Sequence, residues 1–147
     1  MGIHIVCENR KARFLYEVFE TMEAGLVLKG TEVKSLRDHQ ANLQDSFARS
    51  ENGELWLHHM HIAPYFQGNR DNVDPVRTRK LLLNRRELER WQGKATQKGL
   101  SIIPLKVYFK DGYAKVELGL AKGKKAHDKR DSIKKRDAER RMRRGED

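Results

Sequence analysis

Basic side chains are the residues of this sequence whose type and spacing most clearly indicate chemistry. The chain has 147 residues and a net charge of +10, and its segment 122–144 holds twelve Lys and Arg residues against four acidic ones. Cations at this density neutralise phosphates and release the counterions that the phosphates had condensed. The segment therefore predicts a polyanionic partner.

A membrane surface is the competing polyanion, and the sequence disfavours it. After His127 the apolar residues are Ile133, Ala138 and Met142, too few for the apolar face of an interfacial helix. No stretch approaches the ~20 apolar residues of a membrane span, and the single cysteine, Cys7, agrees with a reducing compartment. We therefore expect a cytoplasmic protein that binds RNA or DNA and has no membrane partner.

Basic residues, in one case preceded by an asparagine, form four short groups, the last of which opens the segment 122–144, and each group can contact phosphate or ribose. They are Asn9, Arg10, Lys11 and Arg13; Lys34 and Arg37; Arg77, Arg79 and Lys80; and Lys122, Lys124 and Lys125. A solvated arm is the alternative for the first group, and a solvated helix face is the alternative for the second. In the last group, Gly123 allows a close approach of backbone to RNA.

Glu32 is unexpected beside Lys34 and Arg37, because a carboxylate on an RNA-facing surface repels phosphate. Two roles would account for it. It could orient Arg37 or another cation, or it could accept a hydrogen bond from a base amine or a ribose hydroxyl.

Catalytic and metal-binding patterns are absent from the sequence. Of His58, His59 and His61, only the last two would share a face of a strand, and no cysteine or third well-spaced ligand accompanies them. There is also no glycine-rich phosphate loop and no paired-carboxylate constellation around a nucleophile. We expect no metal, no cofactor and no enzymatic activity. A nuclease or RNA-modifying enzyme is one alternative function. A second is a sequence-indifferent single-strand binder, which would need exposed aromatic residues.

The elements that must position these residues are mainly strands. Asn52-Gly53 supplies the positive φ angles of a type I′ turn and predicts a hairpin of strands 45–50 and 54–59. Val33 and Leu36 predict a short helix within 31–39. Asn84, followed by Glu87, predicts a helix that ends at Gly99. Further strands are expected at 14–20, 24–30, 61–65, 100–109 and 113–121, and a loop at 67–78.

These elements predict a mainly β fold with helices: a small antiparallel barrel of the oligonucleotide-binding (OB) type, with one long and one short helix. We expect a basic arm at 1–13, the barrel at 14–121 and a basic tail at 122–147. Because the tail lacks an apolar period, it should be disordered alone. Three acid-before-base pairs at i,i+4 favour a helix once phosphates neutralise the remaining cations. The apolar run 81–83 and the two tryptophans, Trp56 and Trp91, are assigned to the core.

Five segments, in the same order, closely resemble the signature segments of the small protein B (SmpB) family. They are residues 9–13, 23–25, 30–37, 74–83 and 121–130. The resemblance implies a non-enzymatic adaptor whose barrel binds the tRNA-like domain of tmRNA and delivers it to stalled ribosomes for trans-translation. It also implies an indirect partnership with elongation factor Tu and GTP, through alanyl-tmRNA.

The resemblance also assigns residues. It implies that the tmRNA contact comprises Asn9, Arg10, Lys11, Glu32, Lys34, Arg37, Arg79, Lys80, Lys122, Lys124 and Lys125. The tail is implied to occupy the decoding centre of the small subunit and the vacant mRNA channel. Its expected contacts there are His127, Asp128, Lys129, Arg130, Lys134 and Arg136. The imidazole of His127 could stack on an exposed base.

Overall fold

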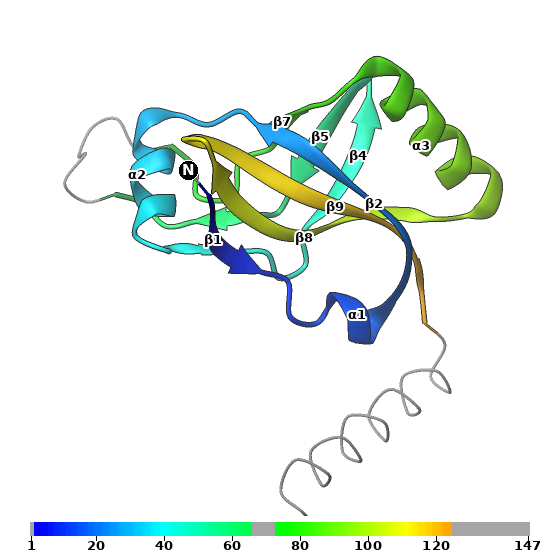
Figure 1. Ribbon diagram of the computed structural model, residues 1–147, viewed down its shortest axis with the longest axis horizontal. Helices are drawn as coiled ribbons and strands as arrows, with labels where there is room; N and C mark the ends of the chain where they lie inside the picture. Colours follow the sequence, from blue (N-terminus) through cyan, green and yellow to red (C-terminus); the bar gives the residue numbers. More distant parts are fainter. Residues whose placement is uncertain (1, 66–72, 125–147) are drawn as a thin grey trace, which may run out of the picture.

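A computed structural model describes residues 2–65 and 73–124, and it confirms a mainly β fold with helices (Figure 1). In chain order the elements are β1 (Ile3–Glu8), α1 (Ala12–Leu15), β2 (Tyr16–Leu26), α2 (Gly30–Arg37), β3 (Ala41–Asn42), β4 (Phe47–Glu51), β5 (Glu54–His58), β6 (His61–Ile62), β7 (Arg79–Leu82), α3 (Arg85–Lys98), β8 (Ser101–Lys110) and β9 (Tyr113–Gly123).

Seven of the strands form one antiparallel sheet, and six of them pair in a closed ring. The order is β1-β8-β4-β5-β7-β2-β9, and β9 also pairs with β8. The cycle from β8 through β9 and back to β8 is the connectivity that a closed antiparallel barrel requires. Outside the cycle, β1 lies on the free side of β8. Strands β3 and β6 pair separately, with Ala41 opposite Ile62.

The predicted hairpin of β4 and β5 is present, and the strands expected at 100–109 and 113–121 form a second hairpin as β8 and β9. Asn52 and Gly53 have φ angles of 53° and 76°. Positive φ angles at both central residues are typical of a type I′ turn, which here joins β4 to β5. Asp111 and Gly112 have φ angles of 52° and 85° in the turn between β8 and β9. Because these turns fix the register, Glu51 lies opposite Glu54 and Lys110 opposite Tyr113.

The long helix α3 begins and ends where the sequence predicts. The Asn84 side chain accepts a hydrogen bond from the Arg86 backbone N–H at 2.8 Å and so satisfies one free donor of the first turn. Gly99 ends the helix with a φ of 64°, in the left-handed region that favours glycine. The helix buries Leu88 and Trp91 against the sheet.

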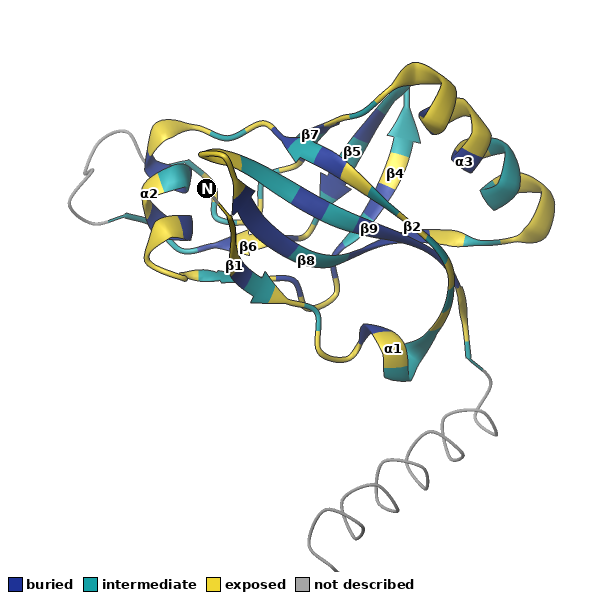
Figure 2. Ribbon diagram, in the orientation of Figure 1, coloured by how far each residue is buried: buried dark blue, intermediate teal, exposed yellow. Residues whose placement is uncertain are grey.

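The core fills the space inside the cycle of strands. Its fully enclosed side chains include Leu36, Leu57, Trp91, Val107 and Leu118. Figure 2 shows that buried residues are concentrated along the strands, including consecutive buried residues in β8 and β9. Trp91 is part of this core as predicted, but Trp56 is only half-buried, because its side of β5 faces away from the core.

Four details differ from the sequence-based prediction. Residues 3–8 form β1, so the basic group at 9–13 follows a strand instead of leading the chain into the first one. One continuous strand, β2, replaces the two expected at 14–20 and 24–30, because the pairing with β9 continues across the polar break. Residues 79–82 form β7, and strand alternation there leaves Leu82 exposed although it was assigned to the core. A third helix, α1, was not predicted.

Candidate nucleic-acid interface

Helix α2 presents two of the predicted cations while its other side anchors it to the sheet. Leu36 is fully buried, and the Ser35 hydroxyl donates to the Ala63 carbonyl at 2.7 Å. Lys34 and Arg37 are therefore on the exposed side. The Lys34 ammonium lies 5.7 Å from the centre of the Tyr65 ring, and the Arg37 guanidinium lies 5.5 Å from that of Phe109. Aromatic rings at these distances attract cations.

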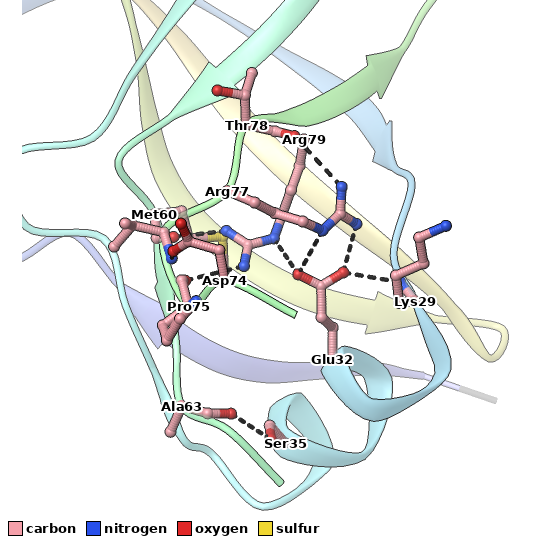
Figure 3. A network of polar contacts seen from close by, with 11 residues as sticks. Lys29, Glu32, Ser35, Met60, Ala63, Asp74, Pro75, Arg77, Thr78 and Arg79 are labelled. Atoms are coloured by element: carbon pink, nitrogen blue, oxygen red, sulfur yellow. Dashed lines mark hydrogen bonds and ion pairs between the residues drawn. The ribbon is translucent and has the colours of Figure 1, made fainter. Parts of the chain in front are cut away.

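The start of α2 is fixed by Glu32, which binds two arginines that are 45 and 47 residues away in the sequence (Figure 3). Its carboxylate accepts a hydrogen bond from the Lys29 backbone N–H at 2.8 Å, which caps the helix. Arg77 donates to both carboxylate oxygens, at 2.5 and 3.1 Å. Arg79 donates from Nε at 2.6 Å. One carboxylate thus ties α2 to β7, 47 residues away along the chain.

Arg79 uses the rest of its guanidinium to hold backbone. Its Nη1 donates to the Met60 carbonyl at 2.6 Å, and its Nη2 donates to the Pro75 carbonyl at 3.0 Å. Arg79 is fully buried and Glu32 is 3% exposed. A buried ion pair is stable only when its remaining donors and acceptors also find partners, and these contacts provide them.

The electrostatics of this pair keep both groups charged. Burial alone would raise the pKa of Glu32, but hydrogen bonds from Arg77, the Lys29 backbone and Arg79 outweigh it and hold the pKa below its ordinary value. Burial lowers the pKa of Arg79, and Glu32 opposes that effect. Two guanidinium groups therefore face one ionised carboxylate.

Burial corrects the predicted role of two residues. Glu32 and Arg79 were assigned to direct RNA contact, yet in this conformation neither has a surface that RNA could touch. The alternative role for Glu32, orienting a cation, is the one that the geometry shows. The cations are Arg77 and Arg79, instead of Arg37. Arg77, whose side chain is 24% exposed, was named in one of the basic groups of the sequence but was not among the residues assigned to the tmRNA contact.

A second basic group lies at the other end of the sheet, around α1 (Figure 1). The Lys124 backbone N–H donates to the Leu15 carbonyl at 2.8 Å, and Lys122 pairs with Glu17 in the ladder of β2 and β9. Arg10 and Lys11 precede α1 and are exposed. A groove of about 990 Å³ opens beside them, between this segment and β4.

Asn9 has a structural task in this second group. Its side-chain amide donates to the Pro104 carbonyl at 3.0 Å, and its backbone N–H donates to the Leu105 carbonyl at 2.8 Å. These bonds fix the segment that follows β1 against β8. They thereby set where Arg10 and Lys11 project.

The structure thus divides the predicted contact residues between two places. Lys34 and Arg37 lie on α2, whereas Asn9, Arg10, Lys11, Lys122 and Lys124 lie around α1. Lys80 belongs to neither group and forms an ion pair with Glu54 on β5, at 3.0 Å. The remaining assigned residues, Lys125, His127, Asp128, Lys129, Arg130, Lys134 and Arg136, lie outside the described residues.

The histidines near β5 take part in packing contacts. The His58 ring stacks on Phe47 with centroids 5.0 Å apart, and its Nε2 lies 3.5 Å from the Glu51 carboxylate. His59 has a φ of 67° and lies outside the strand. Within residues 2–65 and 73–124, no three His, Cys, Asp or Glu side chains are grouped to hold a metal ion. In the same ranges, no helix has the length and hydrophobicity needed to span a bilayer.

Fold and surface together define a small antiparallel β protein with exposed cations at two ends of its sheet. Comparison with known proteins identifies the family of the chain. The family model described as "SmpB protein" matches residues 6–146. The chain belongs to the SmpB family, as the resemblance of the five segments predicted.

Individual relatives agree with this assignment. A protein named "SsrA-binding protein" from Desulforudis audaxviator is 67% identical over 135 residues, which cover 92% of this chain and 88% of that protein. Its namesake from Geobacter sulfurreducens is 58% identical over 142 residues, covering 97% of this chain and 93% of the relative. A chain of the solved structure "tmRNA-SmpB: a journey to the center of the bacterial ribosome" is 56% identical, with a TM-score of 0.70 over 86% of this chain and 93% of that one.

Proposed function

We propose that this protein is a non-enzymatic adaptor that binds the tRNA-like domain of tmRNA and delivers it to stalled ribosomes for trans-translation. The names of its relatives, which are SsrA-binding proteins, and its likeness to a chain of a tmRNA-SmpB structure support the proposal. The observation that carries it is the pair Lys34 and Arg37, exposed on α2, whose start is tied to the sheet by the buried contact of Glu32 with Arg79.

The shape of this surface suits structured RNA. A short, rigid helix projects two cations at a fixed spacing, so they can contact two phosphates of a folded backbone together. Structured RNA is recognised through phosphates, ribose hydroxyls and unpaired bases. The group around α1 adds Arg10, Lys11, Lys122 and Lys124, and α1 and α2 lie well apart in Figure 1, so a ligand that contacts both groups must be large.

In this account the barrel and the tail have separate tasks. The barrel binds tmRNA, and residues 122–147 occupy the decoding centre of the small ribosomal subunit and the vacant mRNA channel. Elongation factor Tu with GTP takes part through alanyl-tmRNA, and the complex works in the cytoplasm. The net charge of the segment 122–144 supports the task of the tail, because ribosomal RNA is a polyanion.

Sizing the RNA that the protein carries tests the proposal. The full chain is purified from its host at low salt, and the bound RNA is extracted and separated by length. We expect one discrete RNA species. That RNA should then support peptidyl transfer on stalled ribosomes, which identifies it as functional tmRNA. A continuous range of lengths would instead support a sequence-indifferent binder, and the proposal would be rejected.

A further inference from the structure

A large aromatic side chain, Phe19, stands on the surface at an irregularity of β2. Its neighbours pair in register with β9, Val18 with Ala121 and Glu20 with Leu120, so Phe19 is the extra residue of a β-bulge. Bulges bend the strand and redirect a side chain. Phe19 itself is 55% exposed, on the side of β2 that faces away from the core.

The ring borders a hollow of about 350 Å³ between β2, the end of α3, the residue Leu100 that precedes β8, and β9. Leu100 and the buried Leu120 supply apolar surface to it. The side chains of Lys94, Lys98 and Lys122 line it as well. A hollow of this size, with an apolar floor and a few charged groups, is typical of a site for a small ligand or one residue of a polymer.

Positive charge prevails around this hollow. Glu20 is its acidic lining residue, and it is engaged by Arg90 at 2.5 Å and by Lys94 at 2.9 Å. Hydrogen bonds lower the pKa of Glu20 to about 2, the largest effect coming from Lys94 and the next from Arg90. Glu17 lies opposite Lys122 in the ladder. Lys98 has no ion pair among the described residues, so it can take an anion from outside.

We propose that this hollow binds an unpaired RNA base stacked on Phe19, with the flanking phosphates on Lys98 and Lys122. A planar ring beside cations is the combination that single-stranded nucleotides bind, since every base has a π face and every link a phosphate. The base must be unpaired, because paired bases are covered by their neighbours in a helix. This inference rests on the proposed RNA-binding function and adds to it a base-binding site in which Phe19 and Lys98 are new and Lys122 was already assigned to RNA.

The position of the hollow connects it to the surface already described. Lys122 belongs both to the hollow and to the basic group around α1, where Lys124 follows it and bonds to Leu15. One RNA strand could therefore follow the cations of α1 and place its next base on Phe19. The base could come from the tRNA-like domain of tmRNA or from ribosomal RNA, because both offer the same chemistry.

Three substitutions at position 19 separate stacking from apolar contact. Phe19→Tyr keeps the flat ring, Phe19→Leu keeps apolar bulk without the ring, and Phe19→Ala removes both. Because the side chain is exposed, all three variants should unfold at the wild-type temperature. Val27→Ala, at another exposed apolar residue, is the matched control for loss of apolar surface elsewhere.

Each full-length protein is titrated with labelled tRNA-like RNA and, separately, with stalled ribosomes carrying wild-type tmRNA. We expect Phe19→Ala and Phe19→Leu to weaken binding about 5- to 150-fold, the range for one base stacked on an aromatic ring, and Phe19→Tyr to retain it. A defect in the RNA titration assigns the base to tmRNA; a defect seen only with ribosomes assigns it to ribosomal RNA. Equal binding by wild type, Phe19→Leu and Phe19→Ala in both titrations overturns the inference while leaving the adaptor function intact. If the wild type itself fails to bind tRNA-like RNA, the proposed function fails first.

Discussion

The guanidinium Nε of Arg79 lies 2.6 Å from the Glu32 carboxylate, and both side chains are enclosed by the protein. Through this contact a buried charge on β7 holds the first turn of a helix whose exposed side carries Lys34 and Arg37. The pair is therefore a structural support for the candidate RNA surface, although neither residue is exposed at it.

Replacing Glu32 by Gln should destabilise the fold by about 3–5 kcal/mol, because it leaves the buried Arg79 charge without its counter-charge. Urea unfolding followed by circular dichroism measures the change. The double substitution Glu32→Leu with Arg79→Met should cost less than Glu32→Gln alone, since it removes both charges. A double variant less stable than Glu32→Gln would show that the ion pair itself is net stabilising.

Acid should weaken the fold through Glu20, whose pKa is lowered to about 2 from 4.5. The unfolded chain binds this proton more tightly than the folded one, so ionised Glu20 stabilises the fold above pH 4.5. That contribution is lost as the pH falls from 4.5 through about 2. Lys94→Gln removes the largest cause of the shift and should move the Glu20 titration toward higher pH. Carboxyl NMR gives both midpoints, and a wild-type midpoint near 4.5 would contradict the hydrogen bonds described here.

The cap of α3 should contribute to stability without affecting RNA. Asn84→Ala removes the acceptor of the Arg86 N–H and should lower the free energy of unfolding by about 1 kcal/mol. Asn84→Asp keeps an acceptor there and should remain near wild type. RNA affinity should be unchanged in both variants, because Asn84 lies at the opposite end of α3 from Lys98, the residue of this helix that is proposed to contact phosphate. Equal stability of Asn84→Ala and wild type would mean that the cap contributes nothing measurable.

Cutting the chain after Lys125 should leave the described fold and its tmRNA binding largely intact. The core described above is formed within residues 2–65 and 73–124, all of which the truncated chain keeps. Rescue should nevertheless fail, since the tail is proposed to contact the decoding centre. Full-length chain with Lys129→Glu and Arg130→Glu should show the same defect, because two attractions to ribosomal phosphate become repulsions.

The readout for these tail variants is peptidyl transfer to alanyl-tmRNA on ribosomes without a codon in the A site, alongside an RNA titration. Transfer at the wild-type rate by the truncated protein would remove the tail from the mechanism. Loss of tmRNA binding by the truncated protein would instead contradict the division of tasks between barrel and tail.

Local signals explain which parts of the fold could be predicted. Asn52-Gly53 and Asn84 with Gly99 act through backbone φ angles and caps, which depend on neighbouring residues alone, and both predictions are confirmed. The strand β1 was missed because it is an edge strand on which Ile3 and Ile5 face solvent. Its sequence therefore lacks the alternation of buried apolar residues that indicates a strand.

The candidate site was only partly predictable for the same physical reason. Lys34 and Arg37 follow from helical spacing, and the structure shows them exposed together. The burial of Arg79 could not be foreseen, since its partner Glu32 is 47 residues away and a local pattern treats every arginine as a surface residue. Phe19 was not singled out either, because an aromatic residue in a strand is usually packed, whereas Phe19 lies on the exposed side of β2.

The most direct test of this account is a titration of labelled tRNA-like RNA at fixed salt with the variant Lys34→Ala/Arg37→Ala. Arg85→Ala/Arg86→Ala, which removes two exposed cations from α3, is the matched control for net charge. Each charged hydrogen bond lost should cost about 1.5–3 kcal/mol, so the α2 variant should bind far more weakly than the control at equal net charge. Equal affinity of the two variants, with both folded by circular dichroism, would contradict the assignment of the tmRNA contact to α2.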